Sequence, residues 1–103
     1  MYRERIHMTV RDRDGWNTAI DATAEINAIC TRLKLPTATL WTETVGPFNQ
    51  LTWDIDHETL ASYEAAQKAL RSDEEWGKQV GRITEVAESD KGFTELLETV
   101  TPV

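Results

Sequence analysis

The sequence predicts an α+β domain in which strands and helices alternate along 103 residues. Residues 3–10, RERIHMTV, and residues 50–56, QLTWDID, alternate apolar and polar side chains with the period of two that is typical of half-buried strands. Two longer stretches carry apolar residues at helical spacing instead. The predicted order is strand, helix, strand, strand, helix, strand.

The first strand places Ile6, Met8 and Val10 on one face. The turn RDRDG follows, and Asp14 is a candidate N-cap for a helix that runs from Trp16 to about Leu33. Pro36 prevents easy continuation, so this helix is expected to end near Lys34.

Residues 37–45, TATLWTETV, are rich in β-forming residues and predict the second strand, while residues 50–56 predict the third. The connection GPFN, residues 46–49, contains Gly and Pro and indicates a hairpin tip. A structural role for this tip is favoured, and binding of a ligand there is the alternative.

The chain after His57 returns to helical spacing, with an apolar stripe of Leu60, Tyr63, Ala66 and Leu70. Residues 72–75, Ser-Asp-Glu-Glu, fit a capping box, so the helical region should break near Arg71 and restart with its apolar face inward. Residues 93–100, FTELLETV, predict the fourth strand.

Right-handed connections arrange these elements as a ferredoxin-like βαββαβ domain, with an antiparallel sheet in the order 4-1-3-2 and helices on one face only. The other face needs cover from water or a partner. We expect it to carry Arg5, His7, Thr9, Trp41, Gln50, Thr52, Asp54 and Leu97.

Composition excludes several classes of function. The formal net charge is −7 and the eleven Lys and Arg are scattered, so nucleic acid is not an expected partner. No apolar run approaches the roughly 18–20 residues of a membrane span. The start MYRERIHMTV does not have the pattern of a signal peptide, and Cys30 is a lone cysteine, so a cytoplasmic location is expected.

Residues 40–76, LWTETVGPFNQLTWDIDHETLASYEAAQKALRSDEEW, resemble the NIPSNAP family. The resemblance lies in a Trp strand, a Gly-x-x-Asn-Gln tip, a second Trp strand, a helix with Tyr63, and an acidic step before Trp76. The first strand, RERIHMTV, departs from the Arg-x-Tyr pattern of the family.

This resemblance implies one NIPSNAP-like domain over residues 1–103 and a homodimer whose two sheets close into a dimeric α/β barrel. The same superfamily contains cofactor-free monooxygenases, haem-degrading enzymes and small cyclases. No catalytic motif transfers to this chain, and no cofactor is implied.

His7 and Asp54 are the first catalytic candidates, because both are expected on the face without helices. A carboxylate beside an imidazole would fix its tautomer and favour a general base. A polar dimer seam is the simpler interpretation. Residues 54, 56, 57 and 58 form an acidic run with a His, but neighbours in a strand point to opposite faces, so no metal site is predicted and Asp56 is assigned as a helix cap.

A ligand pocket between sheet and helices is predicted from the aromatic residues. Its expected lining is Met8, Trp16, Trp53, Tyr63 and Trp76, and Tyr63 is also a weak catalytic candidate. Simple core packing is the alternative for these side chains. Cys30 is expected to be a buried apolar residue.

Two functional hypotheses remain. The first is a small-molecule binder for an aromatic ligand, or in the alternative a cofactor-free monooxygenase or cyclase acting on an aromatic or polyketide-like compound. The second is a non-catalytic dimeric module. An open cavity with a converging His or Tyr would favour the first, and a solidly packed interior the second.

Overall fold

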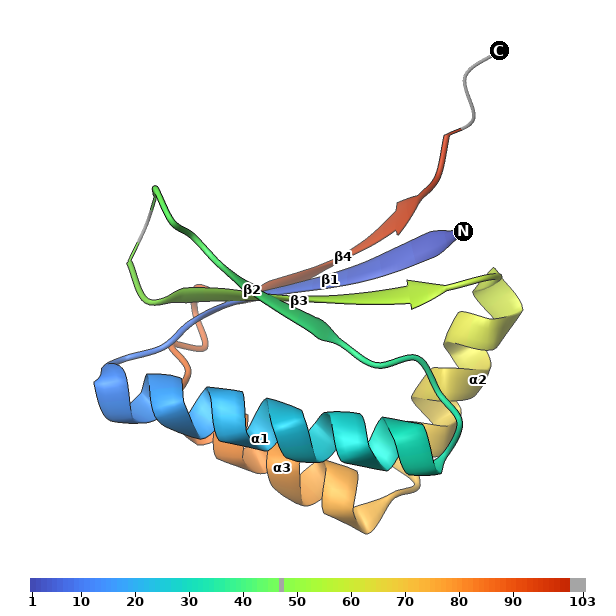
Figure 1. Cartoon of the computed structure of the whole chain (residues 1–103), viewed down its shortest axis with the longest axis horizontal. Coiled ribbons are helices and arrows are strands. Elements are labelled where there is room, and N and C mark those ends of the chain that lie inside the picture. Colours follow the sequence, from blue (N-terminus) through green and yellow to red (C-terminus); the bar gives the residue numbers. More distant parts are fainter. Residues whose placement is uncertain (47, 101–103) are drawn as a thin grey trace.

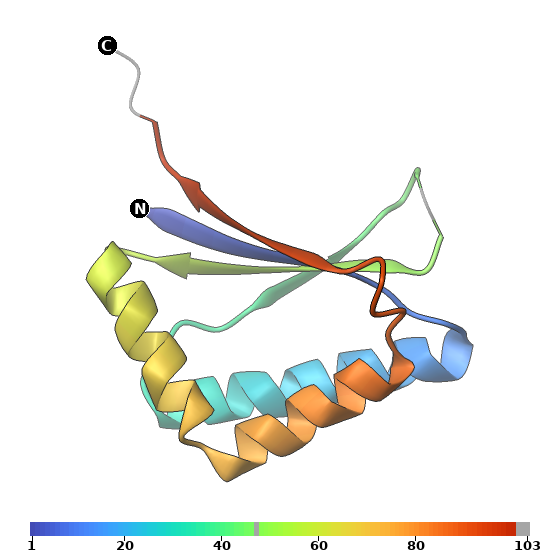
Figure 2. The ribbon, with the colours of Figure 1, turned by 180° about the vertical axis from the view of Figure 1, so that it is seen from behind.

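The computed structural model describes residues 1–46 and 48–100 as one antiparallel sheet of four strands with three helices on one face (Figure 1). The sheet order is β2-β3-β1-β4, which confirms the predicted order 4-1-3-2. The view from behind shows the same layering, with the other sheet face free of helices (Figure 2). The elements are β1 (Tyr2–Thr9), α1 (Arg13–Arg32), β2 (Thr39–Thr42), β3 (Gln50–His57), α2 (Leu60–Arg71), α3 (Glu74–Val86) and β4 (Phe93–Glu98).

The register of the central strands decides which side chains share a face. Ile6 lies opposite Trp53 and Met8 opposite Leu51, and these residues face the helices. Arg5, which lies opposite Asp54 on β3, points the other way because successive side chains alternate. We call the helix-free side of the sheet the open face.

Helix α1 begins earlier than the apolar pattern predicts. Asp12, and not Asp14, is the N-cap, and its carboxylate accepts a hydrogen bond of 2.7 Å from the backbone N–H of Gly15. Gly15 lets α1 approach α3 closely, since a Cβ atom at this position would lie 3.0 Å from the Cβ of Val86 and would require that side chain to shift. The helix ends at Arg32, and Lys34 takes a φ of 59°, so the predicted end near Lys34 is confirmed within two residues.

The second helical region breaks where the sequence predicts, but with different caps. Ser72 closes α2, and Asp73 caps α3 by accepting a hydrogen bond of 2.9 Å from the N–H of Trp76. The capping box lies instead at the start of α2, between Thr59 and Ser62. Asp56 is therefore not the cap of α2, because the helix begins at Leu60, four residues beyond it, and Thr59 is the N-cap.

The hairpin tip extends past the short strand β2, which covers only Thr39–Thr42 of the predicted 37–45. Gly46 adopts a φ of 143° and Asn49 a φ of 61°, conformations that reverse the chain between β2 and β3. Phe48 is 92% exposed at the tip. Residue 47 of the predicted tip lies outside the described residues.

The core lies between the sheet and the neighbouring helices α1 and α3 (Figure 1). Trp53 is its largest buried side chain, and its indole N–H donates a hydrogen bond of 2.7 Å to the hydroxyl of Thr23. That hydroxyl in turn donates to the carbonyl of Ala19 at 2.7 Å. None of the helices within the described ranges is long and apolar enough to cross a membrane.

Candidate functional site

A cavity of about 220 Å³ lies between the sheet and the three helices. Its lining is mainly apolar, and part of it reaches the surface because Pro36 and Thr84 are exposed. Met8, Trp53 and Trp76, which the sequence predicts as pocket residues, all contribute to it. The other apolar lining residues are Ile6, Ile26, Cys30, Leu35, Pro36, Ala38, Ile55, Ala66, Leu70, Val80 and Ile83.

Two of the predicted pocket residues lie elsewhere. Trp16 packs against the core but lines a separate surface hollow together with Phe48 and Asn49 of the hairpin tip. Tyr63 lines a shallow groove on α2, although its ring meets that of His57 edge-on, with centroids 5.2 Å apart. Tyr63 is therefore behind the cavity wall.

The polar end of the cavity is formed by Glu4 of β1, His57 of β3 and Gln67 of α2. The Nε2 atom of Gln67 donates a hydrogen bond of 3.0 Å to Oε2 of Glu4. The other carboxylate oxygen, Oε1, lies 3.5 Å from Nε2 of His57. These contacts bring together three elements that are far apart in the sequence.

His57 is buried without a hydrogen bond. The residue is 3% exposed, and neither Nδ1 nor Nε2 has a hydrogen-bond partner among the described residues. A buried polar atom without a partner costs about 1–3 kcal/mol, so native proteins seldom leave two on one ring. Such a group at a cavity wall calls for a partner from outside the chain, either an ordered water or a ligand.

Glu4 is not among the site residues predicted from the sequence, and His57 appears there only within the acidic run for which no metal site is predicted. The signal was present in the alternation of the strands, because Glu4 shares its face with Ile6 and Met8. His57 likewise continues the inward series of Trp53 and Ile55. Two ionisable residues at inward-facing strand positions therefore indicate the polar end of the cavity. The hydrogen bond from Gln67 to Glu4, in contrast, depends on how α2 packs against the sheet.

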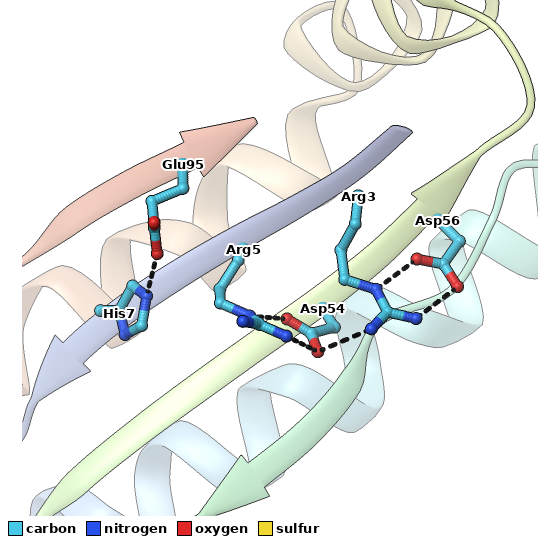
Figure 3. Close-up of polar contacts among 6 residues, drawn as sticks. All are labelled: Arg3, Arg5, His7, Asp54, Asp56 and Glu95. Atoms are coloured by element: carbon cyan, nitrogen blue, oxygen red, sulfur yellow. Dashed lines mark hydrogen bonds and ion pairs between the residues drawn. The ribbon is translucent and has the colours of Figure 1, made fainter. Parts of the chain in front are cut away.

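The open face carries a row of ion pairs instead of the expected His7–Asp54 pair (Figure 3). The guanidinium of Arg5 binds both carboxylate oxygens of Asp54, at 2.8 and 3.1 Å. His7 contacts Glu95 of β4 at 2.6 Å. The prediction of a His7–Asp54 contact is wrong, because His7 lies opposite Thr52 while Arg5 lies directly opposite Asp54.

The Arg side chains determine the ionisation of the two Asp residues beside them. Hydrogen bonds from Arg5 hold the pKa of Asp54 below its usual value, and those from Arg3, at 2.7 and 3.0 Å, do the same for Asp56. A carboxylate that is held ionised by Arg is a poor general base near neutral pH. These contacts indicate a structural role for Asp54.

The acidic run at the end of β3 does not converge on one point. Asp54 and Asp56 bind Arg side chains on the open face, while His57 faces the cavity. Within residues 1–46 and 48–100, no group of three or more His, Cys, Asp or Glu side chains is placed to hold a metal ion. Cys30 lines the cavity, and burial raises the pKa of its thiol.

Comparison with known proteins identifies the fold. No protein-family model matches the chain, and no curated protein matches it. An uncharacterized NIPSNAP domain protein from Burkholderia xenovorans has a similar structure, with a TM-score of 0.76 and 18% identity over 97% of this chain and 95% of that one. A NIPSNAP family protein from Agrobacterium tumefaciens str. C58 also gives a TM-score of 0.76, with 14% identity over 96% and 92% of the two chains.

A second group of similar structures bears an enzyme name. The crystal structure of an antibiotic biosynthesis monooxygenase gives a TM-score of 0.72, with 13% identity over 98% of this chain and all (100%) of that one. At these identities the similarity concerns the fold. The chain has the fold of NIPSNAP domain proteins along nearly its whole length, which confirms the resemblance that the sequence indicates.

Proposed function

We propose that this chain is a NIPSNAP-like protein that binds a small, largely apolar ring compound between its sheet and helices. One observation carries the proposal, namely an apolar cavity that ends at a buried His57 whose two ring nitrogens have no partner in the described part of the chain. A cavity that served only packing would be filled, because interiors are close-packed and voids cost stability. The description as NIPSNAP-like is supported by the fold that the chain shares with NIPSNAP domain proteins.

The size of the cavity limits the ligand. An engineered apolar cavity of roughly 150 Å³ holds one benzene ring. The cavity of about 220 Å³ therefore suits one ring with substituents or two fused rings. Trp53 and Trp76 supply aromatic surface against which a planar ring would pack.

A cavity-filling substitution tests this proposal. Ala66 lines the cavity, so Ala66→Leu should occupy part of it and abolish the thermal stabilisation given by fused-ring aromatic compounds. Ala65, its neighbour on α2, is exposed, so Ala65→Leu is a matched control that should retain binding. Equal stabilisation of both variants by the same compounds would contradict binding in this cavity.

We further propose that two copies associate through the open face and form a dimeric α/β barrel. Three large apolar side chains project there beside the ion pairs, with Trp41 56%, Phe93 55% and Leu97 37% exposed. Exposed aromatic groups among satisfied Arg–carboxylate pairs are typical of protein interfaces, which are enriched in aromatic residues and Arg. A two-fold arrangement would bury the same patch on both copies.

Sedimentation equilibrium at micromolar concentration tests the dimer. The wild-type chain should sediment as a dimer, and Trp41→Glu should produce a monomer, because the substitution places a carboxylate at the proposed interface. Ile20→Glu is the control, since Ile20 is 43% exposed on helix α1. A wild-type monomer, or equal dissociation of both variants, would rule out this interface.

A second candidate function is a cofactor-free monooxygenase or cyclase that acts on an aromatic or polyketide-like compound. It is favoured by the position of His57 beside Glu4, since an imidazole next to a carboxylate could remove a proton from a bound ring compound. Oxygen uptake with hydroxylated aromatic compounds measures the monooxygenase activity. His57→Gln should then abolish turnover while ligand binding persists, and an unchanged rate would exclude His57 as the base.

A further inference from the structure

The chemistry of the polar end points to a particular class of ligand, an inference that rests on the proposed binding function. We propose that the cavity selects a neutral aromatic compound that carries a hydrogen-bond donor such as a hydroxyl group, and that it rejects aromatic carboxylates. The assignment depends on which hydrogen-bonding positions of Glu4, His57 and Gln67 are already used.

Glu4 gives the polar end of the cavity a hydrogen-bond acceptor. Its carboxylate is nine-tenths buried, and Oε2 is taken by Gln67 at 3.0 Å. Oε1 makes no hydrogen bond of ordinary geometry with the described residues, and its nearest basic neighbour is Nε2 of His57 at 3.5 Å. A hydroxyl group of the ligand can donate to Oε1, whereas an ether or a carboxylate cannot.

His57 adds the complementary requirement. A neutral imidazole carries one donor and one acceptor nitrogen. Neither ring nitrogen of His57 has a hydrogen-bond partner among the residues that the structure describes. A hydroxyl group both donates and accepts, so it is the smallest ligand group that can meet both a carboxylate and an imidazole. A ligand carboxylate would instead face the buried Glu4 at close range, and like charges in a poorly solvated site repel strongly.

The arginine residues of the site region do not relieve this repulsion. Arg3 and Arg5 are bound to Asp56 and Asp54 on the open face (Figure 3). Glu4 lies between them on β1 and points to the opposite side of the sheet, because successive side chains of a strand alternate. The cavity lining contains neither Arg nor Lys among the described residues. The charge at the polar end therefore comes from Glu4, and among the described lining residues His57 is the one side chain beside it that can carry a positive charge.

A matched ligand series tests the inference on the intact protein. Naphthol, methoxynaphthalene and naphthoate, substituted at the same ring carbon, share the fused ring and differ in the polar group. Calorimetric titration should show that naphthol binds about tenfold or more tightly than methoxynaphthalene, the effect of one hydrogen bond to a charged group, and that naphthoate binds more weakly still.

Glu4→Gln should reverse the discrimination. It removes the charge and keeps the shape, so naphthoate should bind at least about tenfold more tightly to this variant than to the wild type, while naphthol should lose affinity. Glu64→Gln, which makes the same change at an exposed position of α2, should alter neither. A purely structural effect of Glu4→Gln would weaken all three compounds equally.

The possible outcomes separate this inference from the proposed function. Equal affinity of the wild type for the three compounds would overturn the proposed selection of ligands that carry a hydrogen-bond donor. The proposal that the cavity binds aromatic rings would then still stand. Absence of binding by all three overturns both. Because the wild-type series decides the matter alone, a poorly folded Glu4→Gln protein would not prevent the test.

Discussion

Replacing His57 by Leu is expected to stabilise the protein, in contrast to most substitutions of a buried residue. The imidazole is buried, and within residues 1–46 and 48–100 neither nitrogen has a hydrogen-bond partner. Leu has a similar volume without polar atoms. Relief of one fully unsatisfied nitrogen is worth about 1–3 kcal/mol. Nε2 lies 3.5 Å from the carboxylate of Glu4, so we expect no gain in stability from removing this second nitrogen.

The loss of one contact offsets part of this gain. The edge-on packing of His57 against Tyr63 contributes about 0.5–1.5 kcal/mol, as is usual for such ring pairs. The net expectation is a rise of about 1 kcal/mol in the free energy of unfolding, or about 4 °C or more in Tm for a domain of this size. The unliganded protein thus gives up stability to keep His57 at the cavity wall.

Urea unfolding at a fixed protein concentration, followed by Trp fluorescence, measures the effect. The control is His7→Leu, which removes a 2.6 Å contact with Glu95 and a stacked ring contact with Phe93, and which should give no gain in stability. A loss of more than about 1 kcal/mol in His57→Leu would contradict this expectation, because it would show that the contact with Glu4 is a stabilising ion pair.

Three further predictions concern the fold. Trp53→Phe should lower the free energy of unfolding by about 1–3 kcal/mol, because it removes the hydrogen bond to Thr23 and makes the ring smaller. The double variant with Thr23→Val should lose less stability than the sum of the two single variants. Thermal unfolding of the three variants measures this, and additive losses would show that the bond is unimportant. Arg5 lowers the pKa of Asp54, so the contribution of this carboxylate to stability is complete above the ordinary pKa of Asp and is lost as pH falls through the lower pKa of the folded state. Acid unfolding of Asp54→Asn should lack this part of the transition. An unchanged acid profile would contradict the ion pair. Burial raises the pKa of Cys30, so a thiol reagent should label it slowly at neutral pH and rapidly in urea; equal rates would show that the thiol is accessible in the native state.

The sequence is sufficient to predict the strand order of the sheet and which side chains of each central strand face the helices. Alternation in residues 3–10 and 50–56 specifies which side chains face the helices, and the order of elements with right-handed connections leaves one economical topology. The helix break near Arg71 was also predictable, because a capping sequence interrupts the apolar stripe. The individual caps were not, since Asp12, Asp14, Ser72 and Asp73 all have side chains that can cap a helix.

The pairing of the polar residues follows from the packing of the elements against one another and could not be predicted from the sequence. On the open face, the register placed Arg5 opposite Asp54, and His7 contacts Glu95 instead. Alternation alone does not resolve this choice, because a register shift of two residues keeps every side chain on the same face. In the interior, Glu4 and His57 were predictable as inward-facing residues, but their meeting with Gln67 and the cavity beside them depends on the packing of α2 against the sheet. Alternation is a property of each strand by itself, whereas contacts between elements arise only when their relative positions are fixed.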